Sequence, residues 1–155
     1  MGSLGGWRGH PVAGIYCASK HAVAALTEAL KNEVAHLGID VVTIEPGYFR
    51  TAFLTGGHRV TAFRQIDDLI PITSKWTAVF DAVVGKQPGD PAKGAQVIVE
   101  ALTGSGRCEG RELPARLALG SDAVPAMTEI LRTRQVDLDR WADVVTCTDC
   151  DDDGT

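Results

Sequence analysis

Three residues near the start of the chain could together carry proton-transfer chemistry: Ser3, Tyr16 and Lys20. Tyr16 and Lys20 are four positions apart, so on a helix they project from one face, one turn apart. A free phenol titrates near pH ~10 and shuttles protons poorly at neutral pH, but a nearby ammonium favours the phenolate. Ser3 adds a hydroxyl that can hold a substrate oxygen. Such a group suits proton transfer to or from the oxygen of an alcohol or a ketone.

The elements that must position these residues are a loop and a long helix. Residues 1–13 are rich in glycine, which is typical of a loop. From about residue 14 to residue 37, apolar side chains recur at helical spacing, so a helix is expected to carry Tyr16 and Lys20. Gly38 follows the last apolar residue of this pattern and predicts the end of the helix.

Downstream, the sequence predicts two strands and further helices. Residues 40–45 form a β-branched run bounded by Gly38 and Pro46, which is typical of a buried strand. Residues 48–89 are rich in aromatic side chains and are predicted to contain two helical pieces, the second at about 74–84. The remaining expected elements are a helix at 91–102 capped by Asp90, a strand at 113–119, and a helix from 121 or 122 to about 142.

Two strands make only a marginal sheet, and the strand at 40–45 is expected to be buried on both faces. One of its edges would lie open. Because an exposed apolar edge is a template for pairing, the sequence predicts association with a complementary half of the fold, or a homo-oligomer.

Three segments resemble the second half of a short-chain dehydrogenase/reductase: residues 2–6 (GSLGG), 16–20 (YCASK) and 38–47 (GIDVVTIEPG). The resemblance extends to about Asp143. Residues 119–123 (LGSDA) and a tryptophan near the end resemble the hydroxysteroid- and retinol-dehydrogenase-like branch of that family. The resemblance implies an α/β fold, the C-terminal part of a Rossmann-like, doubly wound parallel sheet.

The same resemblance implies roles for individual residues. Ser3, Tyr16 and Lys20 would be catalytic in an NAD- or NADP-dependent exchange between an alcohol and a ketone, with an apolar small molecule as substrate. The residues implied to touch the cofactor are Tyr16, Lys20, Pro46, Gly47, Phe49 (through its backbone) and Thr51. Thr51 could equally cap the next helix. Tyr48 belongs to the same wall, and Trp76 and Phe80 could serve either as packing residues or as part of a substrate lid.

The sequence departs from the family in what precedes Ser3. Members begin with a strand and a glycine-rich turn that seats the cofactor pyrophosphate on a helix N-terminus, and neither is present here. We therefore expect residues 1–146 to be a partial dehydrogenase domain, a truncated chain that lacks the N-terminal dinucleotide-binding half. The alternative interpretation is a non-catalytic remnant that acts as a binding or interaction module. Cofactor binding by the chain alone would discriminate between the two.

Composition excludes some other classes of protein. The net charge of -5 and the pI near 5.3 provide no basic surface for nucleic acid. No apolar run reaches the ~18 residues of a membrane helix, and no signal peptide is recognisable, so the expected location is the cytoplasm.

The cysteines and histidines do not predict a metal site. Cys147 and Cys150 form one C-x-x-C pair, but structural zinc needs four ligands. We expect free thiols in an acidic, disordered tail over residues 147–155, and a packing role for Cys17. The histidines have no ligand spacing and are expected on the surface; they are His10, His21, His36 and His58.

Overall fold

The computed structural model describes residues 1–55 and 62–150. Its centre is a two-stranded parallel sheet of β1 (Thr43–Pro46) and β2 (Arg116–Leu119), paired from Thr43 opposite Arg116 to Pro46 opposite Leu119. On the other edge of β1, the amide of Gly2 donates to the carbonyl of Ile44 at 2.8 Å. The chain before Ser3 therefore lies beside β1, and the predicted parallel α/β arrangement is confirmed.

Gly2 is packed too tightly against β1 for any side chain. A Cβ at this position would lie 2.5 Å from the Thr43 methyl group and 2.8 Å from the Cγ of Glu45. Contacts this short do not occur between real atoms, so a larger residue would push the Ser3 segment away from the sheet.

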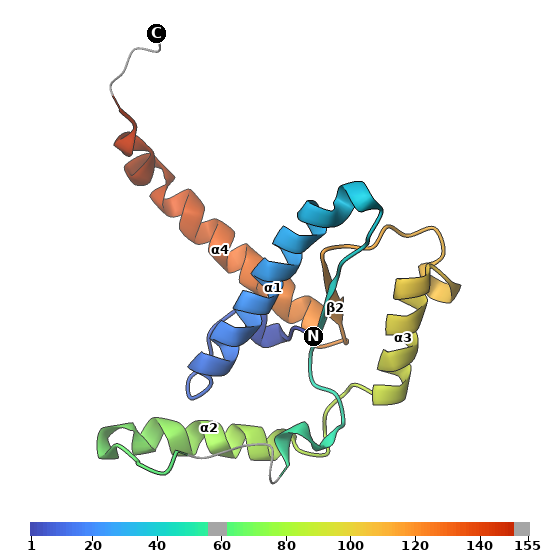
Figure 1. Ribbon diagram of the computed structural model, residues 1–155. Helices are drawn as coiled ribbons and strands as arrows, with labels where there is room; N and C mark the ends of the chain where they lie inside the picture. Colours follow the sequence, from blue (N-terminus) through green and yellow to red (C-terminus); the bar gives the residue numbers. More distant parts are fainter. Residues whose placement is uncertain (56–61, 151–155) are drawn as a thin grey trace.

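Helix α1 (Gly14–Val34) follows the loop and is extended by a short 3-10 turn, Ala35–Leu37. Gly38 ends it with φ 69°, the left-handed conformation that a glycine adopts without a steric penalty. The helix predicted for residues 14–37 and its stop at Gly38 are thus confirmed. In Figure 1, α1 crosses in front of the first part of α4 and close to the sheet.

The other helices are α2 (Ile70–Val83), α3 (Pro91–Thr103) and α4 (Ala123–Val145). The Asp90 carboxylate accepts from the amides of Ala92 and Lys93 at 2.9 and 3.3 Å, which confirms the predicted cap of α3. Figure 1 shows α2 lying apart from the sheet and the C-terminal part of α4 projecting away from the other elements. No helix in the described ranges is long and apolar enough to cross a membrane.

Several predicted boundaries were wrong. The strands begin three residues later than expected, at Thr43 and Arg116. The two segments of the chain lie opposite each other as a parallel pair only from these residues onward. Helix α2 begins at Ile70 rather than near residue 74, since Pro71 is tolerated in the first turn. The first helical piece is reduced to short 3-10 turns, Ala52–Leu54 and Asp67–Leu69, and His58 lies outside the described residues.

A small apolar core joins α4 to the loop after Ser3. Its buried members are Leu4, Ala123, Met127 and Ile130, with Trp7 packed against them. The tail begins with a 3-10 turn, Thr146–Thr148, and residues 151–155 lie outside the described part of the chain.

A buried carboxylate connects the sheet to that loop. Glu45, on β1, has no exposed side-chain surface, and the Nη2 of Arg116 on β2 lies 2.7 Å from its Oε1. The Trp7 indole donates to the other oxygen of Glu45 at 2.6 Å, and Arg116 also donates to the carbonyl of Gly6 at 3.0 Å. The guanidinium lies over the Trp7 ring, 4.1 Å from its centroid. The charge of Glu45 is therefore fully paired and hydrogen-bonded.

We predict that Arg116→Ala lowers the free energy of unfolding by about 3–5 kcal/mol, because it leaves an unpaired charge in a dry site. Chemical denaturation of the two proteins measures the difference. The matched control is Arg132→Ala, which removes an exposed arginine paired with Glu129 and should leave stability nearly unchanged. Equal effects of the two substitutions would contradict this role of Arg116.

Candidate active site

Helix α1 places Tyr16 and Lys20 together, as predicted. The Nζ of Lys20 lies 5.5 Å from the centroid of the Tyr16 ring, and the phenol side chain is 37% exposed. The same ammonium donates to the carbonyl of Met1 at 3.2 Å, so it also connects α1 to the segment that precedes Ser3. An accessible phenol next to a fixed positive charge can exchange a proton with a bound molecule.

Ser3 lies at the start of the same contact region. Its hydroxyl oxygen accepts from the amide of Gly5 at 3.1 Å and caps the 3-10 turn Leu4–Gly6. That turn packs on the Tyr16 ring: a Cβ on Gly5 would lie 3.0 Å from the ring's Cε1. The structure therefore brings Ser3, Tyr16 and Lys20 to one place through their immediate neighbours.

The segment after β1 is held by a carboxylate that the sequence analysis did not single out. Asp122, just before α4, accepts from the amide of Tyr48 through Oδ2 at 2.7 Å. Its Oδ1 is buried with no hydrogen-bond partner in the described chain. A Cβ on Gly47 would lie 2.3 Å from that oxygen, so only glycine fits there. The sequence analysis noted the LGSDA segment that contains Asp122, but the motif did not indicate the contact with Tyr48.

Phe49 and Thr51 are used structurally within this segment. The Phe49 ring is enclosed by glycines: a Cβ would come within 2.7 Å of it at Gly89 and within 2.6 Å at Gly94. The Phe49 ring is thus used for packing, and the contact of its backbone with a cofactor remains a prediction. The Thr51 hydroxyl accepts from the amide of Phe53 at 3.3 Å, which is the capping alternative. Its contact with a cofactor remains a prediction.

Two aromatic contacts join loop side chains to helices α1 and α2. The centroids of the Tyr16 and Phe53 rings are 6.0 Å apart. The His10 and Trp76 rings form a T-shaped pair, also with centroids 6.0 Å apart. His10 is half-buried rather than a plain surface residue, and it accepts from the Nε of Arg8 at 3.1 Å. Periodicity could not have paired His10 with Trp76, because the contact joins a loop to α2.

His10 and Tyr48 have pKa values shifted from their usual ranges. Burial lowers the pKa of the His10 imidazole, and the positive charge of Arg8 lowers it further. Burial raises the pKa of Tyr48; Arg8 opposes this shift, while Asp122 and Tyr16 add to it. His10 is therefore neutral and Tyr48 protonated at neutral pH.

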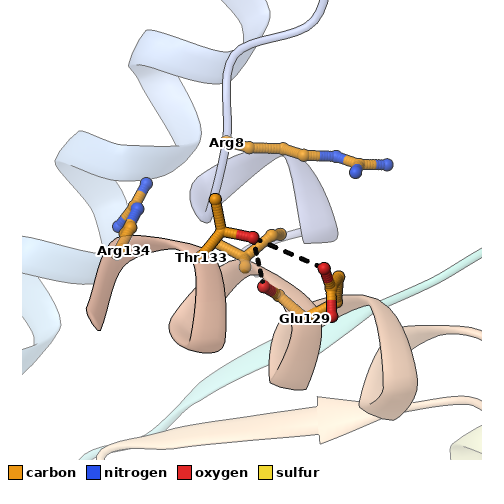
Figure 2. Close-up of a pocket in the computed structure, with 5 residues that line it drawn as sticks. Arg8, Glu129, Thr133 and Arg134 are labelled. Atoms are coloured by element: carbon orange, nitrogen blue, oxygen red, sulfur yellow. Dashed lines mark hydrogen bonds between the residues drawn. The ribbon is translucent and has the colours of Figure 1, made fainter. Parts of the chain in front are cut away.

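A groove of about 270 Å³ lies elsewhere, between the loop after Ser3 and α4. It is lined by Arg8, Glu129, Ile130, Thr133 and Arg134, and none of the predicted catalytic residues reaches it. Figure 2 shows the guanidinium of Arg8 directed away from Arg134, and the Thr133 hydroxyl bonded to Glu129 of its own helix. The two arginines do not converge, so the groove is not an anion site of the catalytic centre.

Comparison with known proteins identifies this arrangement. The family described as short chain dehydrogenase matches residues 1–58, which include all three predicted catalytic residues. A solved short-chain dehydrogenase from Streptomyces avermitilis superposes on 96% of this chain with a TM-score of 0.76 and 35% sequence identity. The chain belongs to the short-chain dehydrogenase/reductase family. It covers 51% of that solved chain.

Curated relatives agree with this assignment. Human retinol dehydrogenase 16 is 40% identical over 55 residues, which are 36% of this chain and 17% of that protein. Human 17-beta-hydroxysteroid dehydrogenase type 6 is 47% identical over 38 residues, 24% of this chain and 12% of its own length. NADPH-dependent 3-dehydrocapnine reductase of Ornithobacterium rhinotracheale is 33% identical over 96 residues, 56% of this chain and 34% of that enzyme. The predicted family and its hydroxysteroid/retinol-like branch are confirmed, and each match spans a minority of the relative.

We predict that Asp122→Ala loosens the segment after β1. Without the carboxylate the Tyr48 amide has lost its acceptor, so its hydrogen exchange should speed up by the equivalent of about 1–3 kcal/mol of local opening free energy. The neighbouring substitution Ser121→Ala, at an exposed residue, should leave this amide unaffected. Unchanged protection of Tyr48 in the Asp122 variant would show that the contact does not hold the segment.

Proposed function

We propose that this chain is the catalytic part of an NAD(P)-dependent oxidoreductase that interconverts an alcohol and a ketone. The observation that carries the proposal is the meeting of the accessible Tyr16 phenol, the Lys20 ammonium and the turn capped by Ser3. The names of two similar proteins, retinol dehydrogenase 16 and NADPH-dependent 3-dehydrocapnine reductase, describe oxidoreductase chemistry of the same general kind. No observation favours the non-catalytic alternative.

In the proposed mechanism, a bound nicotinamide cofactor would supply the hydride chemistry at the substrate carbon. Tyr16 donates the proton to the attached oxygen in reduction and accepts it in oxidation. Lys20, whose ammonium donates to the Met1 carbonyl, lies beside the phenol. The Ser3 hydroxyl retains donor capacity because the Gly5 amide uses only its acceptor side, so it can donate to the substrate oxygen where negative charge develops.

The residues of this chain fit one end of a dinucleotide. Lys20, the backbone of the Gly47–Phe49 segment and Thr51 are accessible candidates for the nicotinamide and its ribose. For the pyrophosphate, the sequence contains no glycine-rich turn between a strand and a helix. We propose that a complementary dinucleotide-binding half, outside these 155 residues, holds that end of the cofactor.

The side chains near Tyr16 favour an apolar substrate with one oxygen to be oxidised or reduced. Phe53 lies beside the phenol, with the two ring centroids 6.0 Å apart. On α2, which the resemblance makes part of a substrate lid, the tilted rings of Trp76 and Phe80 are 6.2 Å apart. The shifted pKa values of Tyr48 and His10 keep both side chains uncharged at neutral pH, which suits contact with an apolar molecule.

We predict that Tyr16→Phe lowers turnover of the enzyme, assembled with its dinucleotide-binding half, by about 10²–10⁴-fold or more. The phenyl ring fills the same space but has no proton to transfer, so cofactor affinity should change little. Steady-state kinetics with apolar secondary alcohols measures the effect. Ser19→Ala is the matched control, because its hydroxyl donates only to the Tyr16 carbonyl within α1. Turnover like that of the wild type in the phenylalanine variant would remove Tyr16 from its proposed role.

We also predict that the 155-residue chain alone binds NADH or NADPH no more tightly than about millimolar, since the pyrophosphate has no binding turn. Fluorescence titration of the reduced cofactor measures this. Adding the dinucleotide-binding half should restore binding. Micromolar affinity of the isolated chain would show that other residues of this chain hold the pyrophosphate.

A further inference from the structure

The first 3-10 turn of the chain fills the space between α1 and a buried carboxylate. A Cβ on Gly5 would lie 3.0 Å from the Tyr16 ring, and a Cβ on Gly6 would lie 3.0 Å from the carbonyl oxygen of Lys20. The same Gly6 Cβ would lie 3.5 Å from Oε1 of Glu45. The turn therefore touches the catalytic helix on one side and the sheet on the other, and any displacement of it changes its position relative to Tyr16.

Trp7 holds the end of this turn to the sheet. Its amide donates to the carbonyl of Leu4 at 3.1 Å, which closes the turn. Its indole Nε1 donates to Oε2 of Glu45 at 2.6 Å. Glu45 lies on β1 and has no exposed side-chain surface, so it is an acceptor in a fixed place. A hydrogen bond to a charged acceptor is shorter and stronger than one between neutral groups.

Ser3 lies at the other end of the same turn. Its hydroxyl oxygen accepts from the amide of Gly5 at 3.1 Å, and its carbonyl accepts from the amide of Gly6 at 2.8 Å. Just before it, the Gly2 amide is bonded to the carbonyl of Ile44 on β1. The direction of the Ser3 hydroxyl thus depends on where the Gly5 amide lies, and that amide stays in place only while the turn is closed.

We propose that Trp7 is a positioning residue for Ser3. Its indole bond to Glu45 keeps the turn closed, and the closed turn keeps the Ser3 hydroxyl where it can donate to a substrate oxygen beside Tyr16. The inference rests on the proposed function, in which negative charge develops on that oxygen. A displacement of only about 1 Å in a group that meets the reacting atoms can lower a rate by about a hundredfold.

The substitution Trp7→Phe removes this hydrogen bond and little else. The Trp7 ring packs on the apolar core and lies 4.1 Å from the guanidinium of Arg116, and a phenyl ring can keep both contacts. Glu45 stays paired, because the Nε of Arg116 donates to each of its oxygens at 3.1 Å. The matched control is Trp141→Phe, at a 57%-exposed position near the end of α4.

Hydrogen exchange of the Gly5 amide in the 155-residue chain tests the structural step and needs no cofactor. Trp7→Phe should speed this exchange by about tenfold or more, because the turn that holds the amide on Ser3 opens more often. Trp141→Phe should leave the rate as in the wild type. Equal exchange of the Gly5 amide in the two variants would overturn the proposal.

Steady-state kinetics of the enzyme assembled with its dinucleotide-binding half tests the catalytic step. Trp7→Phe should lower kcat by about 10–100-fold with little change in KM, whereas Trp141→Phe should leave both constants unchanged. In a Ser3→Ala background, Trp7→Phe should have no further effect on kcat, because the hydroxyl that it positions is absent. A general loss of packing would lower kcat by the same factor in both backgrounds, and that result would overturn the proposal, as would an unchanged kcat in Trp7→Phe.

Failure of the proposed function gives a different pattern. Turnover of Ser3→Ala like that of the wild type, or an assembled enzyme without oxidoreductase activity, would overturn the role of Ser3 in catalysis and the purpose of its positioning with it. The faster exchange of the Gly5 amide in Trp7→Phe would persist in that case, since it depends only on the contacts within this chain.

Discussion

The pairing of Glu45 with Arg116 is the interaction on which the remaining structure depends. A carboxylate without exposed surface is tolerated only when it is paired and hydrogen-bonded, and here Arg116 on β2 and the Trp7 indole donate to Glu45 on β1. The arginine extends the connection to the Gly6 carbonyl and, at 3.6 Å, to Glu28 on α1. One ion pair thereby sets the relative positions of β1, β2, the loop after Ser3 and the helix that carries Tyr16.

A second carboxylate, that of Asp122, holds the segment that follows β1. Asp122 arrives from the start of α4 and fixes the backbone after β1, just as Glu45 fixes the loop that follows Ser3. Among the side chains predicted to be catalytic, Tyr16 is left accessible. Rigidity thus comes from the buried carboxylates, while the groups proposed to exchange protons remain free to meet a substrate. This division of roles fits a site that must be preorganised and open at the same time.

The sequence predicted those features whose cause is local. The end of α1 at Gly38 and the cap of α3 at Asp90 follow from the conformational preferences of single residues, so they could be read directly. The starts of the strands could not, because pairing depends on which residues of a distant segment lie opposite. Likewise, Asp122 bonds an amide 74 positions away and Arg116 reaches Glu45 across 71 positions, so neither contact leaves a periodic signal. The family motifs indicated Ser3, Tyr16 and Lys20 as catalytic candidates but did not indicate the side chains that support them.

The enclosure of the Phe49 ring has a consequence for how this chain can vary. Gly89, before α3, and Gly94, within it, make room for one aromatic ring, and a Cβ added at Gly120 after β2 would lie 3.5 Å from the same ring. No side chain can be added at Gly89 or Gly94 while the ring stays in place, and a smaller residue at position 49 would leave a void. These positions form a single volume, so a change at one is acceptable only together with an opposite change at another. Since the backbone of Phe49 lies in the proposed cofactor wall, that shared volume sets the depth of the wall itself.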